Sequence, residues 1–153
     1  MKKNIFRIFI AMSLIAFFGS CQPKFEKEYS WAYPLAGDWT LTAYVDGEYV
    51  YGPFEVKSYN TAFGQDSIWF DDYDGNFWDM KYKVAVDMNA KTFQTSGSIN
   101  AIKGYPINIS VSNGKVVNTD SITFDMKFED DPGTIYTLSG HRTTSYEEYM
   151  GEF

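Results

Sequence analysis

The segment 77–88 alternates apolar and polar side chains at nearly every second position. One face carries Trp78, Met80, Tyr82, Val84, Val86 and Met88, and most of the other carries Asp79, Lys81, Lys83 and Asp87. A β-strand has a side-chain period of two, whereas an amphipathic α-helix needs apolar residues at intervals of three and four. The segment therefore predicts a strand with one face in a core, and it leaves little room for a helix.

Shorter segments with the same alternation recur from Gly37 to about Arg142. We expect them to form strands at 39–45, 48–59, 66–71, 92–98, 106–112, 115–117, 122–129 and 134–143. Turn sequences separate them, including Asp46-Gly47, Asp74-Gly75, Asn113-Gly114 and Asp131-Pro132-Gly133. The predicted fold is an all-β antiparallel meander of about eight strands, because the connections are short and hold no helical pattern. Such a meander forms a barrel or a sandwich, and a barrel leaves no exposed strand edge.

Composition excludes several classes of function. The formal net charge of −7 is unsuited to nucleic acid, since binding there requires Lys and Arg to neutralise phosphates. A single cysteine excludes an intramolecular disulfide framework and any cysteine-cluster metal site, and a single histidine excludes His-rich metal sites. We therefore expect no metal ion and no cofactor.

The N-terminus has the pattern of a bacterial lipoprotein signal. Lys2, Lys3 and Arg7 precede an apolar stretch at 8–18 that is too short for a confident membrane span. The sequence Gly19-Ser20-Cys21 then resembles a lipobox, in which the cysteine is acylated and the chain is cut before it. The alternative is ordinary secretion, with Cys21 as a buried free thiol.

The lipoprotein interpretation divides the chain into a signal peptide at 1–20, a lipidated tether at 21–35, a barrel domain at 36–144 and a tail at 145–153. Residues 1–20 hold three basic and no acidic side chains, so cleavage lowers the net charge from −7 to −10. An anionic bilayer repels so acidic a domain, and attachment must then come from the lipid. The expected location is the outer membrane, facing either the periplasm or the cell surface.

Aromatic residues make up 19% of the chain, and core packing accounts for only part of them. Exposed aromatic rings stack on sugars or line apolar ligand pockets. The candidate ligand-binding residues are Trp69, Phe70, Trp78, Tyr82 and Phe124. Packing in the core, or simple exposure at the surface, is the alternative for all of them.

No catalytic set can be completed from the sequence. Ser139 and His141 lie two apart on a predicted strand, so they share a face, but the spacing is too long for a direct hydrogen bond without side-chain reach. The acidic turn 71–76 lacks the ligand spacing of a calcium loop, and we interpret it as solvated, like the acidic turn 129–133. These two acidic turns could share a cation only if they met in space.

Several short sequences together resemble one known family. They are Tyr33-Pro34-Leu35-Ala36-Gly37-Asp38-Trp39, Tyr59-Asn60-Thr61, Asp66-Ser67-Ile68-Trp69, Gly75-Asn76-Phe77-Trp78-Asp79, Asp130-Asp131-Pro132-Gly133-Thr134 and Ser139-Gly140-His141-Arg142. The combination is similar to the Bacteroidetes lipoproteins of the "lipid-binding putative hydrolase" family. The resemblance implies a calycin-like, lipocalin-like barrel of eight antiparallel strands with an apolar interior and an apolar ligand. It carries no catalytic residues over to this chain.

Three functions follow as hypotheses, in order of preference. The first is an outer-membrane lipoprotein that binds a lipid or another apolar small molecule in the barrel. The second is a glycan-contacting accessory or structural module of a cell-surface complex. The third is a weak esterase, and we expect a binding protein rather than an enzyme.

Overall fold

The computed structural model describes residues 30–118 and 120–143. They form eight strands: β1 (Gly37–Val45), β2 (Glu48–Asn60), β3 (Ser67–Asp71), β4 (Lys81–Asp87), β5 (Thr92–Ile99), β6 (Asn108–Val117), β7 (Ser121–Phe128) and β8 (Asp131–Arg142). The predicted signal peptide 1–20, the lipidation site Cys21 and the tail 145–153 lie outside the described residues. Within the described part of the chain, no helix is long and apolar enough to cross a membrane.

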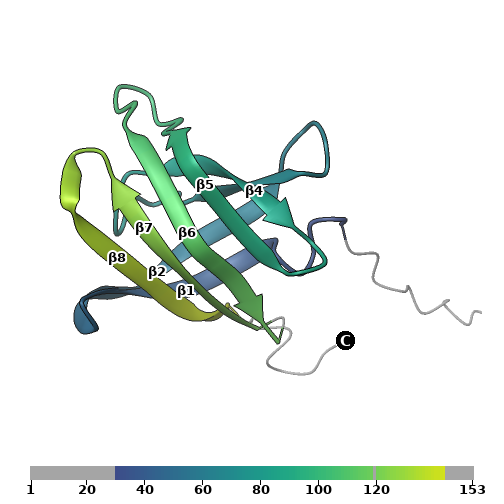
Figure 1. The fold of residues 1–153 in the computed structure, drawn as a ribbon, viewed down its shortest axis with the longest axis horizontal. Coiled ribbons are helices and arrows are strands. Elements are labelled where there is room, and N and C mark those ends of the chain that lie inside the picture. The colour runs from purple at the N-terminus through teal and green to yellow at the C-terminus, as the bar shows by residue number, and fades with distance from the viewer. Residues whose placement is uncertain (1–29, 119, 144–153) are drawn as a thin grey trace, which may run out of the picture.

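The eight strands form one closed antiparallel barrel in sequence order (Figure 1). Each strand pairs with the next one, and β8 pairs with β1 from Trp39 opposite Arg142 to Tyr44 opposite Thr137. The closure gives every strand two neighbours, although β2 pairs with β3 only from Lys57 to Asn60 and β4 pairs with β5 only from Ala85 to Asp87. The predicted all-β, calycin-like barrel is confirmed.

The alternation seen in the sequence becomes the inside and outside of the barrel. On β1 the side chains of Trp39, Leu41 and Ala43 are fully buried, and on β7 those of Ile122, Phe124, Met126 and Phe128 are at most 1% exposed. Polar residues between them face solvent. The inward faces of all eight strands meet in one apolar cluster, which is the core of the domain.

The predicted turn at Asn113-Gly114 is wrong, because β6 runs through it as a β-bulge. The pairing of β6 with β7 shifts register between Ser112 and Lys115, and Asn113 has a φ of 55°. A Cβ on Gly114 would lie 2.6 Å from the ring of Phe93, so this site requires glycine for close packing. A bulge and a turn have the same local signature, and the continued pairing of β6 with β5 and β7 on both sides of Asn113 distinguishes them.

One end of the barrel is closed by the segment that precedes β1. Of the predicted tether 21–35, the structure describes residues 30–35, and there Ala32 and Leu35 are fully buried in the core. The hydroxyl of Ser58 joins this segment to the wall: it donates to the carbonyl of Leu35 at 2.7 Å and accepts from the indole of Trp39 at 2.8 Å. Access to the interior therefore has to come from the opposite end.

Candidate functional site

The opposite end of the barrel is covered by a loop rich in aromatic residues. This loop, residues 72–80, connects β3 to β4, and its Phe77 and Trp78 reach rings on β2, β7 and β8. In a closed barrel of eight strands, β7 and β8 lie opposite β3 and β4. The loop therefore crosses the mouth of the barrel from one wall to the other. We call Phe77 and Trp78 the aromatic lid.

A buried carboxylate gives the lid loop its shape. Asp72 is 1% exposed, and its two carboxylate oxygens accept hydrogen bonds from the backbone amides of Asn76, Phe77 and Trp78 at 2.9–3.1 Å. This bonding turns the chain where the sequence pattern predicts a strand, so β4 begins at Lys81 instead of residue 77. The interpretation of the whole turn 71–76 as solvated is therefore wrong for Asp72.

The lid packs on rings that line the mouth. The indole of Trp78 stacks on Phe128 with a centroid distance of 4.1 Å and an interplanar angle of 10°. Phe77 stacks on Phe54 at 4.8 Å and meets the edge of Tyr136 at 5.5 Å. Offset and edge-on pairs of this kind add stabilisation beyond the area they bury. The mouth is closed by aromatic contacts, with Phe77 and Trp78 themselves only partly buried.

A chain of hydrogen bonds through Trp78, Tyr105 and Asp130 joins the lid to two other loops, and we call it the latch. The Trp78 indole donates to the Tyr105 hydroxyl at 3.0 Å, and that hydroxyl donates to the carboxylate of Asp130 in the β7–β8 turn. Beside it, the Tyr136 hydroxyl donates to Asp131 at 2.8 Å. Burial and these carboxylates raise the pKa of Tyr105, and they raise the pKa of Tyr136 to about 12. Both phenols therefore stay protonated and act as donors at neutral pH.

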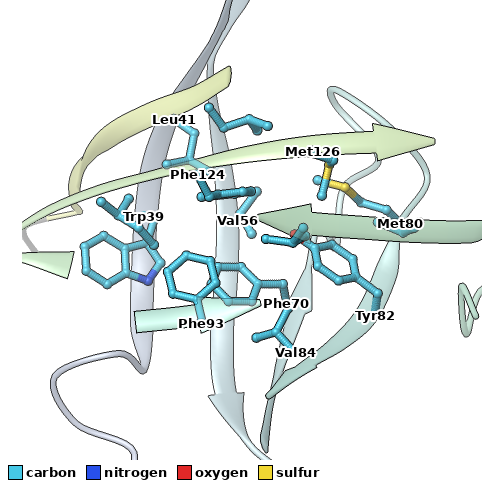
Figure 2. Close-up of a cluster of buried hydrophobic side chains, with 14 of the residues drawn as sticks. Trp39, Leu41, Val56, Phe70, Met80, Tyr82, Val84, Phe93, Phe124 and Met126 are labelled. Atoms are coloured by element: carbon cyan, nitrogen blue, oxygen red, sulfur yellow. The ribbon is translucent and has the colours of Figure 1, made fainter. Parts of the chain in front are cut away.

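The interior beneath the lid is apolar and aromatic (Figure 2). The Phe70 ring lies 5.0 Å from Phe93, 5.6 Å from Phe124 and 5.8 Å from Tyr82, measured between centroids. Phe70, Tyr82 and Phe124 are at most 1% exposed. The hydroxyl of Tyr82 is buried in this cluster without a hydrogen-bond partner.

The structure separates the five predicted ligand-binding residues into three places. Phe70, Tyr82 and Phe124 share the interior, and Trp78 belongs to the lid. Trp69 lies on the outer face, because neighbouring residues on a strand point to opposite sides. There the Lys83 ammonium lies 4.7 Å and the Lys81 ammonium 5.6 Å from its ring centroid. Trp69 is therefore not placed to contact a ligand in the interior.

Five residues of the mouth are not among the ligand-binding residues that the sequence predicts. They are Asp72, Phe77, Tyr105, Phe128 and Tyr136. The alternation places Phe77 and Phe128 on strands, and nothing local distinguishes an aromatic residue in the middle of a strand from one at the mouth. The motif Asp72 followed by Gly75-Asn76 was a usable signal, because Asp side chains commonly bond backbone amides a few residues on.

The other candidate residues do not assemble into a site. Ser139 and His141 are exposed on the outer face of β8, and no hydrogen bond joins their side chains in the described structure. Among residues 30–118 and 120–143, no group of three His, Cys, Asp or Glu side chains is arranged to hold a metal ion. The carboxylates of the two acidic turns, Asp72 and Asp130, are used by the lid loop and its latch instead.

A surface depression of about 680 Å³ lies on the outside of β4–β7. Its lining is mixed: the polar residues Gln94, Thr95, Ser96, Ser110, Ser112 and Lys127 contribute together with Ala85 and Val111, and apolar atoms make up slightly more of the lining than polar atoms. The depression is open to solvent on the outer wall, so an apolar chain lying in it would stay partly exposed to water. The barrel interior beneath the lid has the apolar, aromatic surroundings that would shield such a chain from water.

A comparison with family models gives one match that covers most of the chain. The model described as "Lipid-binding putative hydrolase" matches residues 24–147. A search of curated proteins gives no match.

Proposed function

Since this chain belongs to the family of lipid-binding putative hydrolases, we propose that it binds a hydrophobic or amphipathic small molecule inside the barrel, beneath the aromatic lid. The observation that carries the proposal is the lid itself. A loop that places Phe77 and Trp78 across the mouth, on top of an apolar interior, offers an incoming apolar chain aromatic surface on every side.

A ligand enters on this account by lifting the lid. The loop is attached to the far wall through ring contacts and through the bond from Trp78 to Tyr105, whereas strand pairing holds the walls themselves. An acyl chain can replace the ring contacts without leaving any polar group unpaired. The bond to Tyr105 is the one directional contact of the Trp78 side chain that has to break.

We place the protein at the outer membrane, held by a lipid on Cys21, with the barrel facing the periplasm or the cell surface. The basic, apolar and lipobox-like segments at 1–21 support this placement. A membrane and an apolar ligand would be its two partners. Mass spectrometry of the purified protein tests the anchor: the proposal expects diacylglycerol on Cys21 as the new N-terminus, and an intact residue 1 would contradict it.

Displacement of a fluorescent probe tests the binding function. Protein purified after expression of the full chain should enhance the fluorescence of N-phenyl-1-naphthylamine, and a long-chain lipid should reverse the enhancement. Phe77→Ala should weaken probe binding because it removes a ring from the mouth. Phe63→Ala is the matched control, since Phe63 is 89% exposed in the β2–β3 connection at the other end. Equal probe binding by both variants would contradict a site beneath the lid.

A glycan-contacting module of a cell-surface complex is the second candidate. The tyrosines near the β1–β2 hairpin support it, since Tyr49 is 63% and Tyr51 43% exposed. Binding to a glycan array that disappears in Tyr49→Ala, together with no displacement of the apolar probe, would favour this function over the first.

A further inference from the structure

The Tyr82 hydroxyl is the one buried side-chain polar atom without a hydrogen-bond partner in the described part of the chain. The other buried polar side chains all have partners: Ser58 bonds Trp39 and Leu35, Thr61 bonds Phe63, Asp72 bonds three amides, and Asn100 bonds the backbone of Lys81 and Asp79. Buried hydroxyl groups are rarely left unpaired, because each has given up its bonds to water. A phenylalanine would fill the same space without that cost.

Tyr82 lies at the end of β4 nearest the lid loop. It is the second residue of β4 and follows the loop that carries Phe77 and Trp78. Figure 2 shows its ring pointing from β4 into the apolar cluster, which also contains the thioethers of Met80 and Met126. Methionine side chains are unbranched and adapt their shape easily. The part of the cluster that holds these methionines can therefore repack around an inserted chain more readily than a part made of rings alone.

We propose that Tyr82 is the polar anchor of the ligand site, and that its hydroxyl donates a hydrogen bond to an uncharged oxygen carried by a long apolar chain. The ligand class is a neutral lipid, with an ester carbonyl or an alcohol near one end of the chain. The inference rests on the proposed function, and it specifies which apolar molecules that function selects.

The surroundings of Tyr82 favour an uncharged ligand oxygen over a carboxylate. Burial and the negative charge of Asp72 raise the pKa of Tyr82 well above its usual range, so the phenol remains a donor. The same negative charge would repel a ligand carboxylate. Lys81 and Lys83 flank Tyr82 in sequence but contact the Trp69 ring on the outer face, and Arg142 lies at the closed end of the barrel. A carboxylate at Tyr82 would thus be a buried charge without a cation beside it, which is costly.

Competition experiments with matched ligands test the proposal. Wild-type protein and the variants Tyr82→Phe and Tyr59→Phe would be loaded with N-phenyl-1-naphthylamine, and methyl palmitate, palmitate and heptadecane would serve as competitors. Tyr59→Phe is the control, because its hydroxyl bonds Asp71 on the outer face. Wild type should bind methyl palmitate more tightly than palmitate. Tyr82→Phe should weaken methyl palmitate about fivefold and leave heptadecane unchanged, since only the ester loses a hydrogen bond.

A merely structural role for Tyr82 gives a different result. If Tyr82→Phe changed the affinities of methyl palmitate and heptadecane by the same factor, the anchor would be refuted while the proposed function stood. A wild-type preference for palmitate would refute the uncharged ligand. No displacement by any competitor would refute the proposed function as well. The empty Tyr82→Phe protein should melt no lower than wild type, so that a loss of ester affinity cannot come from misfolding.

Discussion

The guanidinium of Arg142 lies over the indole of Trp39, with 4.5 Å between the guanidinium carbon and the ring centroid. The same group donates to the carbonyls of Ala36 at 2.8 Å and Pro34 at 2.7 Å. One side chain at the end of β8 thus joins the first strand of the barrel to the segment that closes it. The planar fork of arginine makes this possible, because it stacks with its face while it donates from its edge.

Replacement of Arg142 should open the closed end of the barrel. Arg142→Ala removes two charge-assisted hydrogen bonds and a cation–π contact, and the free energy of unfolding should fall by about 2–3 kcal/mol. Arg142→Lys keeps the charge but not the fork, so it should recover less than half of that loss. Urea denaturation measures the free energy of unfolding of both variants. A lysine variant as stable as wild type would mean that charge alone, and not the fork geometry, matters at this position.

Asp72 should control the lid without contacting the ligand. Asp72→Asn replaces a carboxylate that accepts three amide hydrogen bonds with a group that has a single acceptor oxygen, and it should destabilise the protein by about 2 kcal/mol. Hydrogen exchange of the amides of Phe77 and Trp78 should accelerate more than exchange in the strands. Asp74→Asn, in the exposed part of the same loop, is the control and should stay within about 0.5 kcal/mol. Equal effects of the two substitutions would refute the assigned role of Asp72.

Two glycines of β8 should respond very differently to alanine. A Cβ on Gly140 would overlap the carbonyl oxygen of Thr40 and lie 2.9 Å from the Cα of Leu41, where the neighbouring backbone cannot move aside. Gly140→Ala should therefore cost about 3 kcal/mol of folding stability. A Cβ on Gly133 would meet nothing within 4 Å, and Gly133→Ala should stay within about 0.5 kcal/mol. Thermal unfolding of the two variants would reveal whether β1 and β8 approach as closely as described.

Stability should fall in alkaline solution over a defined range. The pKa of Tyr136 is raised from 10.0 to about 12 by burial and by its bond to Asp131. The unfolded chain therefore loses this proton first, and the free energy of unfolding falls as the pH rises from about 10 through 12. Urea titrations at several pH values measure the slope, and Tyr136→Phe should make it shallower. A slope that Tyr136→Phe leaves unchanged would show that this phenol does not contribute.

The fold was largely predictable because it depends on alternation, which is a property of the sequence. Inward-facing positions such as Leu41 and Phe124 are apolar, and turns such as Asp46-Gly47 have a recognisable sequence. The lid was not predictable in the same way. The alternation continues through Phe77 and Trp78, and it masks the local bonding of their amides by Asp72, five and six residues earlier, which takes them out of β4.

The ligand-binding residues illustrate the same limit. The sequence predicts ligand-binding roles for Phe70, Trp78, Tyr82 and Phe124, but it does not indicate which of them lie in the interior and which lies in the lid. Trp69 and Phe70 lie on opposite faces of one strand, and the sequence does not indicate which of the two faces the interior. The latch between Trp78, Tyr105 and Asp130 joins three loops far apart in the chain, so no local pattern could have indicated it.

Quenching of tryptophan fluorescence by a brominated lipid tests the central claim most directly. The methyl ester of dibrominated stearic acid would be added to wild-type protein and to the variants Trp78→Phe and Trp69→Phe. Bromine quenches tryptophans that it contacts, and Trp78 and Trp69 lie at the mouth and on the outer wall, respectively. A ligand beneath the lid predicts strong quenching in wild type and Trp69→Phe and weaker quenching in Trp78→Phe, where the quenching that remains comes from Trp39 in the core. Quenching that persists in Trp78→Phe but disappears in Trp69→Phe would place the lipid on the outside of the barrel and contradict the account.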